Sequence, residues 1–328
     1  MLSDTTVLID AYSQIFRSFY AVRRLTTSRG EPVNAIMVFT RLLLTLEKQY
    51  ASGRGAMLFD CGRVAFRLEL LPEYKANRPP MPDDLKTQIP HLREMAEAFG
   101  WKLLQAENFE ADDLIGGICV NQSGKIKIVS SDKDLSQLVD DRVTLLYPGK
   151  GGGFEERGAS EVKAHFGVAP ELLVDYLALV GDSSDNIAGV PGIGPKSAAD
   201  LLNTYGGISG WIDSPECLQG SRYYAKVFDK KELLERNLQL VKLNCQLPAN
   251  WSDLDGMLRK KAPDWEHIRS LCCRWELKSI LKELPEPEEP DFGELFSVSS
   301  DSRKEPLRTE AEPLESESSG ALVQGELF

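Results

Sequence analysis

Apolar residues in the first 160 positions follow two alternating patterns. Short aliphatic runs that end in polar residues are typical of buried strands, and the predicted strands are 7–10, 56–60 and 126–130. Between them, apolar residues recur at helical spacing, and the predicted helices are 33–50, 85–99 and 112–120. This alternation of strands and helices predicts an α/β domain with a mostly parallel sheet.

The pattern changes after about residue 160, where strand signals fade. Helical spacing dominates at 170–180, 196–205 and 226–243, which predicts a second, helical region over 161–282. The glycine-rich segment between Gly149 and Gly153 lacks the Lys-Ser/Thr pair of a phosphate-binding loop. We interpret it as a hairpin or flexible turn.

The composition changes again near Glu283. Residues 283–328 hold 13 acidic and 3 basic residues, many Pro and Ser, and few apolar positions, which predicts a disordered acidic tail. The chain has a net charge of −12, of which −10 lies in this tail and −2 in residues 1–282. The overall acidity therefore does not exclude a nucleic-acid partner for the body.

Other compositional features narrow the class of protein. No apolar run reaches the ~20 residues that span a bilayer, and no basic region precedes an apolar stretch at the N-terminus, so we expect a cytoplasmic, monomeric protein without a signal peptide. The six Cys form no CxxC pair and the three His are far apart in sequence. A Cys/His zinc site or a disulfide framework is therefore not expected.

Carboxylates gather where the predicted strands and helices begin or end. The nine candidates are Asp10, Asp60, Glu110, Asp112, Asp113, Asp132, Asp134, Asp182 and Asp185. Each alone is explained as a helix cap or turn former. Together, without cations, they would cost several kcal/mol through repulsion and desolvation. Oxygen ligands without His or Cys favour Mg²⁺ or Mn²⁺, and two such ions suit in-line displacement at phosphate.

A glycine-rich hairpin separates two of the predicted helices. Its pattern G-x-P-G-I-G-x-K contains Gly189, Gly192, Ile193, Gly194 and Lys196. Such a helix-hairpin-helix pattern offers free amides to phosphate oxygens of DNA, with the isoleucine as a core anchor. The alternative is an ordinary turn between helices.

A basic stretch lies upstream, between residues 66 and 80. Lys75 and Arg78 are three residues apart and would share one face of a helix, from which they could reach a scissile phosphate, with Arg67 nearby. An ordinary solvated helix face is an equally good interpretation of this segment alone.

The motifs together resemble the 5′-nuclease (flap endonuclease) domain of bacterial DNA polymerase I and the related phage 5′-nucleases, over about residues 5–285. The motifs that carry the resemblance are LID at 8–10, LTTSRGEPVNA at 25–35, PEYKANR at 72–78, FEADD at 109–113, SSDKDLSQL at 130–138 and GDSSDNIAGVPGIGPKSA at 181–198. Ala11 departs from the family's usual Gly, and no polymerase domain follows in this sequence, so we expect a free-standing enzyme.

The resemblance implies a PIN-like nuclease core with a helical arch over 1–160 and a helix-hairpin-helix DNA-binding region over 161–282. It implies two divalent ions, one held by Asp10, Asp60, Glu110 and Asp112 with Asp113 nearby, the other by Asp132, Asp134, Asp182 and Asp185. Lys75 and Arg78 would stabilise the scissile phosphodiester, and a bridging K⁺ would sit at the hairpin. The implied substrates are 5′ flaps, nicked duplex ends and RNA primers on DNA, in a nucleoid-associated enzyme of replication and repair.

Two other functions share part of this pattern. A PIN-like ribonuclease has a similar acid cluster but lacks the glycine hairpin. A non-catalytic DNA-binding scaffold would be expected to have lost some of the nine carboxylates, and none is missing.

The last five residues form a separate motif. Gln324, Leu327 and Phe328 resemble the Q-x-x-L-F peptide by which bacterial replication proteins bind the sliding clamp, and a flexible tether would raise its local concentration at DNA. The alternative is a chance match in a low-complexity tail.

The charge of the body supports this interpretation. If the nine carboxylates are set aside as metal ligands, residues 1–282 hold 35 basic groups against 28 acids, a net charge of +7. A modest positive field of this kind is compatible with salt-sensitive binding to phosphates.

Overall fold

A six-stranded sheet forms the centre of the protein. The computed structural model describes residues 5–62, 64–149 and 153–286. The strand order is β3-β2-β1-β4-β5-β6, and every neighbouring pair is parallel except β5 and β6. The strands are β1 (Thr6–Asp10), β2 (Gly55–Leu58), β3 (Lys102–Leu104), β4 (Ile126–Val129), β5 (Val143–Pro148) and β6 (Phe154–Arg157).

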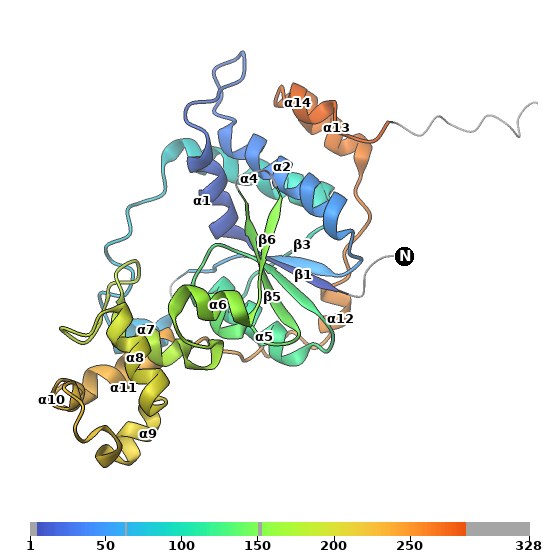
Figure 1. Ribbon diagram of the computed structural model, residues 1–328. Helices are drawn as coiled ribbons and strands as arrows, with labels where there is room; N and C mark the ends of the chain where they lie inside the picture. Colours follow the sequence, from blue (N-terminus) through green and yellow to red (C-terminus); the bar gives the residue numbers. More distant parts are fainter. Residues whose placement is uncertain (1–4, 63, 150–152, 287–328) are drawn as a thin grey trace, which may run out of the picture. The chain divides into compact units, whose positions relative to one another are not determined.

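Helices cover both faces of this sheet. Side chains of β1 alternate, so that Val7 and Ile9 join the apolar cluster on one face and Leu8 joins that on the other. The first face is covered by α1 (Ala11–Ala21), α2 (Asn34–Tyr50) and α4 (Asp83–Ala98) (Figure 1). The opposite face is covered by α5 (Ala111–Asn121) and α6 (Ala159–Phe166). Burial of a parallel sheet on both faces explains the aliphatic runs of its central strands β1, β2 and β4.

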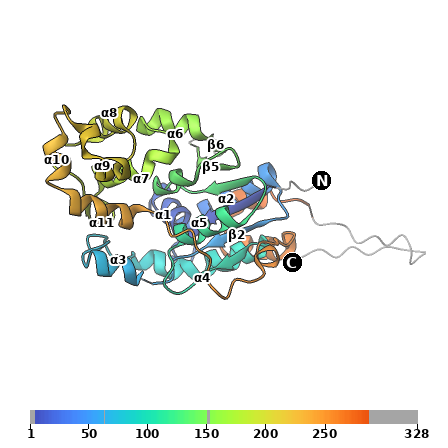
Figure 2. The same ribbon diagram turned by 90° about the horizontal axis from the view of Figure 1, so that it is seen from below.

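A third apolar cluster, away from the two faces of the sheet, holds a group of short helices together. It is built around Trp211, which is fully buried, and includes Ile193 and Leu240. Figure 2 shows α7 to α11 gathered at one end of the molecule. These elements are α7 (Leu173–Val180), α8 (Pro195–Tyr205), α9 (Ile208–Asp213), α10 (Tyr224–Phe228) and α11 (Lys231–Val241), with 3₁₀ turns η2 (Pro170–Leu172) and η3 (Pro215–Leu218).

The chain returns to the sheet after α11. Leu243, Trp251 and Leu258 pack into the cluster beside α5, together with α12 (Leu254–Met257). The last two helices, α13 (Trp265–Arg274) and α14 (Lys278–Leu281), pack against the cluster of α2 and α4 through Ile268 and Ile280. Residues after 241 are therefore part of the core around the sheet, although they follow the helical group in sequence.

The three predicted strands and most predicted helices are confirmed within two residues. The prediction missed β3, β5 and β6, which are short or partly exposed and lack a long aliphatic run. The helix expected over 226–243 is two helices, α10 and α11, separated at Asp229 and Lys230. The hairpin expected near Gly149 joins antiparallel β5 and β6, and its Gly149 amide donates to the Gly153 carbonyl over 2.8 Å. Residues 150–152 lie outside the described part of the chain.

The segment between β2 and α4 differs from the expected helical arch. It contains one short helix, α3 (Ala65–Leu70), followed by turns through residue 78 and an extended run that includes Pro79, Pro80 and Pro82. Prolines lack an amide donor and disfavour helix in the preceding residue, so the run cannot continue α3. Among the described residues, no helix is both long and apolar enough to cross a membrane.

Candidate active site

Three candidate carboxylates lie at the carboxyl ends of neighbouring parallel strands. Asp10 is the last residue of β1, while Asp60 and Asp132 follow β2 and β4 by two and three residues. Since β2, β1 and β4 are adjacent and parallel, their ends meet at one edge of the sheet. A cleft of about 680 Å³ opens at this edge, and Asp10, Asp60, Asp112 and Asp132 all line it. We call it the acidic cleft.

Asp10 links the sheet to the first helix. Its Oδ1 accepts from the Ser13 amide (3.2 Å), which caps α1, and its Oδ2 accepts from Ser130 Oγ (2.7 Å). Burial raises the pKa of Asp10 to about 7, and the charges of Asp132 and Asp60 add to the shift. An acid that resists ionisation among other acids is typical of a site for cations.

Asp60 and Asp112 bring the second strand and α5 to the same place. The Ala111 amide at the start of α5 donates to Asp60 Oδ1 over 2.7 Å. This contact holds the first turn of α5 against the sheet edge, so that Asp112 faces the cleft. Burial raises the pKa of Asp112 well above its ordinary value, followed by repulsion from Asp132 and Asp10.

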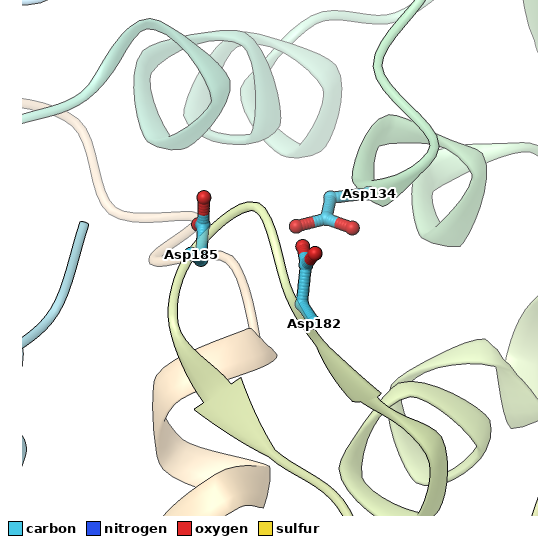
Figure 3. A group of neighbouring side chains, drawn as sticks. All are labelled: Asp134, Asp182 and Asp185. Atoms are coloured by element: carbon cyan, nitrogen blue, oxygen red, sulfur yellow. The ribbon is translucent and has the colours of Figure 1, made fainter. Parts of the chain in front are cut away.

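A second group of carboxylates lies beside the first. Asp134, Asp182 and Asp185 each offer one oxygen, and these oxygens all lie within 4.8 Å of one another (Figure 3). Asp134 begins the 3₁₀ helix η1 (Asp134–Leu138), whereas the other two come from the turn between β7 (Gly181–Asp182) and β8 (Ile187–Ala188). Asp134 Oδ1 is buried and has no hydrogen-bond partner within the described residues.

Glycines make this turn possible. A Cβ on Gly181 would lie 2.3 Å from the Gly189 amide nitrogen, and one on Gly189 would lie 2.2 Å from the Val180 carbonyl oxygen. No side chain fits at either position, and Gly181 also has a φ of +77°. The close approach of the two strands sets the spacing between Asp182 and Asp185.

The two predicted phosphate-contacting residues lie in the turns after α3 rather than on a helix. Lys75 has a φ of +55°, and its amide donates to the Asp185 carbonyl over 3.0 Å. Its ammonium lies 2.7 Å from Glu110 Oε1, and Arg78 Nη2 lies 2.6 Å from Asp185 Oδ1. Both side chains line the acidic cleft. Lys75 and Arg78 therefore reach the same cleft because of this turn, and not because they share one face of a helix as the sequence predicted.

Lys133 is a cleft residue that sequence reasoning missed. Its ammonium lies 2.7 Å from Asp182 Oδ1, which also accepts from the Ser184 amide and hydroxyl. Burial alone would raise the pKa of Asp182, but the hydrogen bonds from Lys133 and Ser184 outweigh it and lower the pKa. The position of Lys133 between Asp132 and Asp134 in the SSDKD motif could have indicated that it lies in the cleft.

Tyr74 is a second missed residue. Its hydroxyl lies 3.1 Å from Glu110 Oε2 and 2.9 Å from Asp185 Oδ2. Burial and the two nearby carboxylates raise its pKa, so the hydroxyl keeps its proton and donates. Glu110 and Asp185 belong to different predicted metal sets, and Tyr74 connects them.

Asp113 and Arg67 have roles that differ from those predicted. Arg67 is 2% exposed and forms two 2.7 Å hydrogen bonds to the two oxygens of Asp113, with a third of 3.0 Å to Glu110. The Asn244 amide donates to Asp113 Oδ1 over 2.8 Å. A guanidinium this deeply buried does not reach a DNA backbone, and Asp113, which is 1% exposed with both oxygens bonded to Arg67, does not line the acidic cleft. The pair instead ties α3 to α5 beneath the cleft.

The glycine hairpin connects the β7–β8 turn to α8. Val190 and Ile193 are buried in the helical cluster and anchor it, while Gly192, Gly194 and Lys196 are exposed. Gly192 has a φ of +79°, and a Cβ there would lie 2.5 Å from Lys226 Nζ, so a second lysine approaches the hairpin. Gly194 precedes Pro195 at the first turn of α8. Gln324, Leu327 and Phe328 lie outside the described residues.

The donors at the cleft fit divalent cations. Every candidate is an oxygen, the three oxygens of the second group are close enough to share one ion, and the buried Asp134 Oδ1 has no other partner. Asp10, Asp60, Asp112 and Asp132 form the first group, with Asp132 between the two. Glu110, which was expected to hold the first ion, instead contacts Lys75, Arg67 and Tyr74 at 2.7–3.1 Å.

A mostly parallel sheet with an acidic edge, lined also by the four basic side chains Arg17, Lys75, Arg78 and Lys133, is typical of α/β enzymes that act on phosphodiesters. Residues 5–167 match the family described as "5′-3′ exonuclease, N-terminal resolvase-like domain", and residues 168–265 match "5′-3′ exonuclease, C-terminal SAM fold". The chain is 38% identical over 283 residues to a 5′-3′ exonuclease from Aquifex aeolicus, covering 85% of this chain and 95% of that protein. The chain belongs to the 5′-3′ exonuclease family and is a nuclease.

Other relatives share part of their length with this chain. DNA polymerase I from Pseudomonas aeruginosa is 45% identical over 204 residues, which are 61% of this chain and 22% of the polymerase. The fold is similar to that of T5 5′-exonuclease with bound zinc, with a TM-score of 0.59, 23% identity, and coverage of 85% of this chain and 97% of that one. A T5 flap endonuclease in complex with DNA and metal ions has a TM-score of 0.60 at 23% identity and the same coverage.

Proposed function

We propose that this nuclease cleaves 5′ flaps, nicked duplex ends and RNA primers paired to DNA in a divalent-metal-dependent reaction. The observation that carries the proposal is the acidic cleft, whose carboxylates share its wall with Lys75, Arg78 and Lys133, while a second group of carboxylates contacts Lys133 and Arg78. Acids alone would repel a phosphodiester, and cations on the same wall provide attraction for it. The DNA-bound T5 flap endonuclease of similar fold supports this choice of substrate.

The residues of the cleft have distinct roles in this proposal. Asp10, Asp60, Asp112 and Asp132 hold one Mg²⁺ or Mn²⁺, and Asp134, Asp182 and Asp185 hold another. Such ions supply an activated water and stabilise negative charge on phosphate when bound. Arg78 and Lys75 orient the scissile phosphate and neutralise the charge that develops on it. Tyr74 shares its one hydroxyl proton between Glu110 and Asp185, which links the two carboxylates.

The hairpin has a separate role in binding. We assign the exposed amides of Gly192 and Gly194, with Lys196, to the phosphate backbone of the duplex, with K⁺ as a bridging ion. Buried Val190 and Ile193 hold the hairpin rigid for this contact. The sheet with its covering helices then provides most of the catalytic residues and the α7–α11 group binds the duplex, while the β7–β8 carboxylates link the two.

A labelled 5′-flap duplex tests the function directly. With Mg²⁺ we expect cleavage at the junction, leaving a 5′-phosphate and a 3′-hydroxyl, and with EDTA no cleavage. An RNA flap on DNA should be cleaved as well, whereas single-stranded RNA alone should not be. Cleavage in EDTA, or preferential cleavage of single-stranded RNA, would contradict the proposal, the second result in favour of a PIN-like ribonuclease.

The C-terminal peptide supports a second, independent role. We propose that Gln324, Leu327 and Phe328 bind the bacterial sliding clamp and recruit a nuclease that is otherwise monomeric. A pull-down with purified clamp should retain the full chain and lose it after deletion of residues 324–328. Equal retention of both chains would overturn this role and leave the nuclease function untouched.

A further inference from the structure

A second groove adjoins the acidic cleft. It has a volume of about 670 Å³ and lies between α1, α2 and the start of the β5–β6 hairpin. Arg17 and Tyr20 line both the groove and the cleft, so the two openings share a wall. The proposed function does not use this groove.

The side chains that line the groove differ in charge from those that line the acidic cleft. Its described lining contains two cations, Arg17 and Arg41, and no carboxylate. Its walls are apolar and include Met37, Leu42 and Phe154. A volume of this size with apolar walls and a few polar groups is typical of sites for small molecules or parts of larger ligands.

One aromatic ring stands at the shared wall. Tyr20 is 63% exposed, which is unusual for a large apolar side chain. Its ring forms an edge-to-face pair with Phe19, at 5.2 Å between centroids and 79°, and the ring lines both openings. Tyr12, Phe16 and Tyr20 lie at i, i+4 and i+8 on α1, and all three line the cleft. The helix that begins at Asp10 therefore leads from the carboxylates to the groove along a row of aromatic rings.

The cations of the groove differ in availability. Arg41 is engaged by Glu283 at 2.5 Å and by Ser279. Arg17 donates to the Pro148 carbonyl over 2.6 Å and forms no ion pair with a described residue. Arg17 thus keeps its positive charge available for an anion, at the point where the groove and the cleft meet.

We propose that this groove binds an unpaired nucleotide of the 5′ flap, with the base on Tyr20 and its phosphate at Arg17. Apolar walls and an exposed ring suit a base, and base–aromatic stacking is tolerant of sequence. Continuity with the cleft means that a strand leaving the carboxylates along α1 arrives at Tyr20. The inference rests on the proposed flap-cleaving function and adds a binding site for the strand that is removed.

The test places 2-aminopurine at each of the first three unpaired positions of a 5′-flap duplex and measures its fluorescence on the full chain in EDTA. We expect quenching at one position with the unaltered protein and with Tyr20→Phe, and its loss with Tyr20→Ala. The KM for flap cleavage with Mg²⁺ should rise roughly 5- to 100-fold in Tyr20→Ala, the range for loss of one stacked base. Since Tyr20 is exposed, neither variant should unfold.

Charge provides a second, matched pair of variants. Thr45 lines the groove but not the cleft, so Thr45→Glu places a negative charge near the expected phosphate, and Thr45→Gln is its neutral counterpart. We expect weaker flap binding for Thr45→Glu than for Thr45→Gln. Val120→Asp, at a 65% exposed position of α5 outside both openings, should behave as the unaltered protein.

The results separate this inference from the proposed function. Equal quenching in Tyr20→Ala and Tyr20→Phe, or equal flap binding by Thr45→Glu and Thr45→Gln, would overturn the groove as a nucleotide site while flap cleavage by the unaltered protein stands. Failure of the unaltered protein to cleave any flap or nicked duplex with Mg²⁺ would instead refute the proposed function.

Discussion

Eight of the nine candidate carboxylates, all except Asp60, fall into two sets with opposite surroundings. The paired set (Glu110, Asp113, Asp182 and Asp185) forms ion pairs with Arg67, Lys75, Arg78 or Lys133. The open set (Asp10, Asp112, Asp132 and Asp134) forms no ion pair within the described residues, and burial raises the pKa of each member.

This difference shows where the protein supplies its own positive charge and where it relies on an ion. A buried carboxylate with a bound cationic side chain is stabilised within the fold, whereas one facing only other carboxylates is destabilised. The open set therefore marks the positions that depend on a divalent ion for neutralisation, whereas Asp182 and Asp185 of the paired set would share an ion with Asp134. The paired set marks the positions at which structure and phosphate binding are coupled.

The largest effect is expected for neutralising a member of the open set. Asp132→Asn should lower kcat for flap cleavage by on the order of a thousandfold or more, because it removes a shared metal ligand. It should not lower the melting temperature measured in EDTA, because it also removes repulsion with Asp10 and Asp112. Asp200→Asn, at an exposed position of α8, serves as control. Full activity in Asp132→Asn would refute the open set as metal ligands.

Removing the buried cation that binds Glu110 and Asp113 of the paired set should destabilise the fold. Arg67→Ala leaves Asp113 buried and unpaired, which costs about 3–5 kcal/mol of unfolding free energy. Urea unfolding monitored by circular dichroism measures the loss. The double variant Arg67→Met with Asp113→Leu should recover part of it, since no charge remains without a partner. A stable Arg67→Ala protein would show that the pair does not hold α3 to α5.

The exposed cations that bind the paired set should affect catalysis more than they affect stability. Arg78→Ala should lower kcat roughly a hundredfold, because a charge near the phosphate is lost. The kcat of Arg78→Lys should lie between that of Arg78→Ala and that of the unaltered protein, since a lysine keeps the charge but cannot form a bidentate contact. The melting temperature should change little, as the Arg78 side chain is 48% exposed. Lys86→Ala, with an exposed side chain on α4, is a suitable control.

The smallest effect is expected from Mg²⁺ on thermal stability. At a hundredfold excess over its dissociation constant, Mg²⁺ adds about 2.7 kcal/mol, and the melting temperature should rise by roughly 5–10 °C. Asp134→Asn should reduce this rise. An identical rise in the variant would exclude Asp134 as a ligand.

The pH dependence of the Mg²⁺ effect follows from the raised pKa of Asp10, about 7 against 3.8 for the free side chain. Between these values the folded protein keeps a proton that the unfolded chain has lost, so stability in EDTA falls as the pH rises from about 4 through 7. Mg²⁺ competes with that proton. The rise in melting temperature with Mg²⁺ should therefore be larger at pH 8 than at pH 6, and equal rises would contradict the open character of Asp10.

Much of the site follows from local sequence because strand ends are local features. The aliphatic runs before Asp10, Asp60 and Asp132 predict strands, and parallel strands bring their carboxyl ends to one edge. The Gly181–Gly189 region likewise requires a tight turn wherever it lies, so the placement of Asp182 near Asp185 follows from the motif. By contrast, β3 and β6 have no pattern of their own and form only because the sheet offers them a partner.

The amino-acid sequence by itself determined the α/β class, the cluster of acidic residues and the glycine hairpin, since each depends on residue type and short-range spacing. Tertiary structure alone decided which acids are paired and which are open. Arg67 and Asp113 are 46 residues apart in sequence, and their burial turned an expected DNA contact and a metal ligand into a structural pair. The groove beside Tyr20 has the same origin, because its walls come from three elements that only the folded sheet brings together.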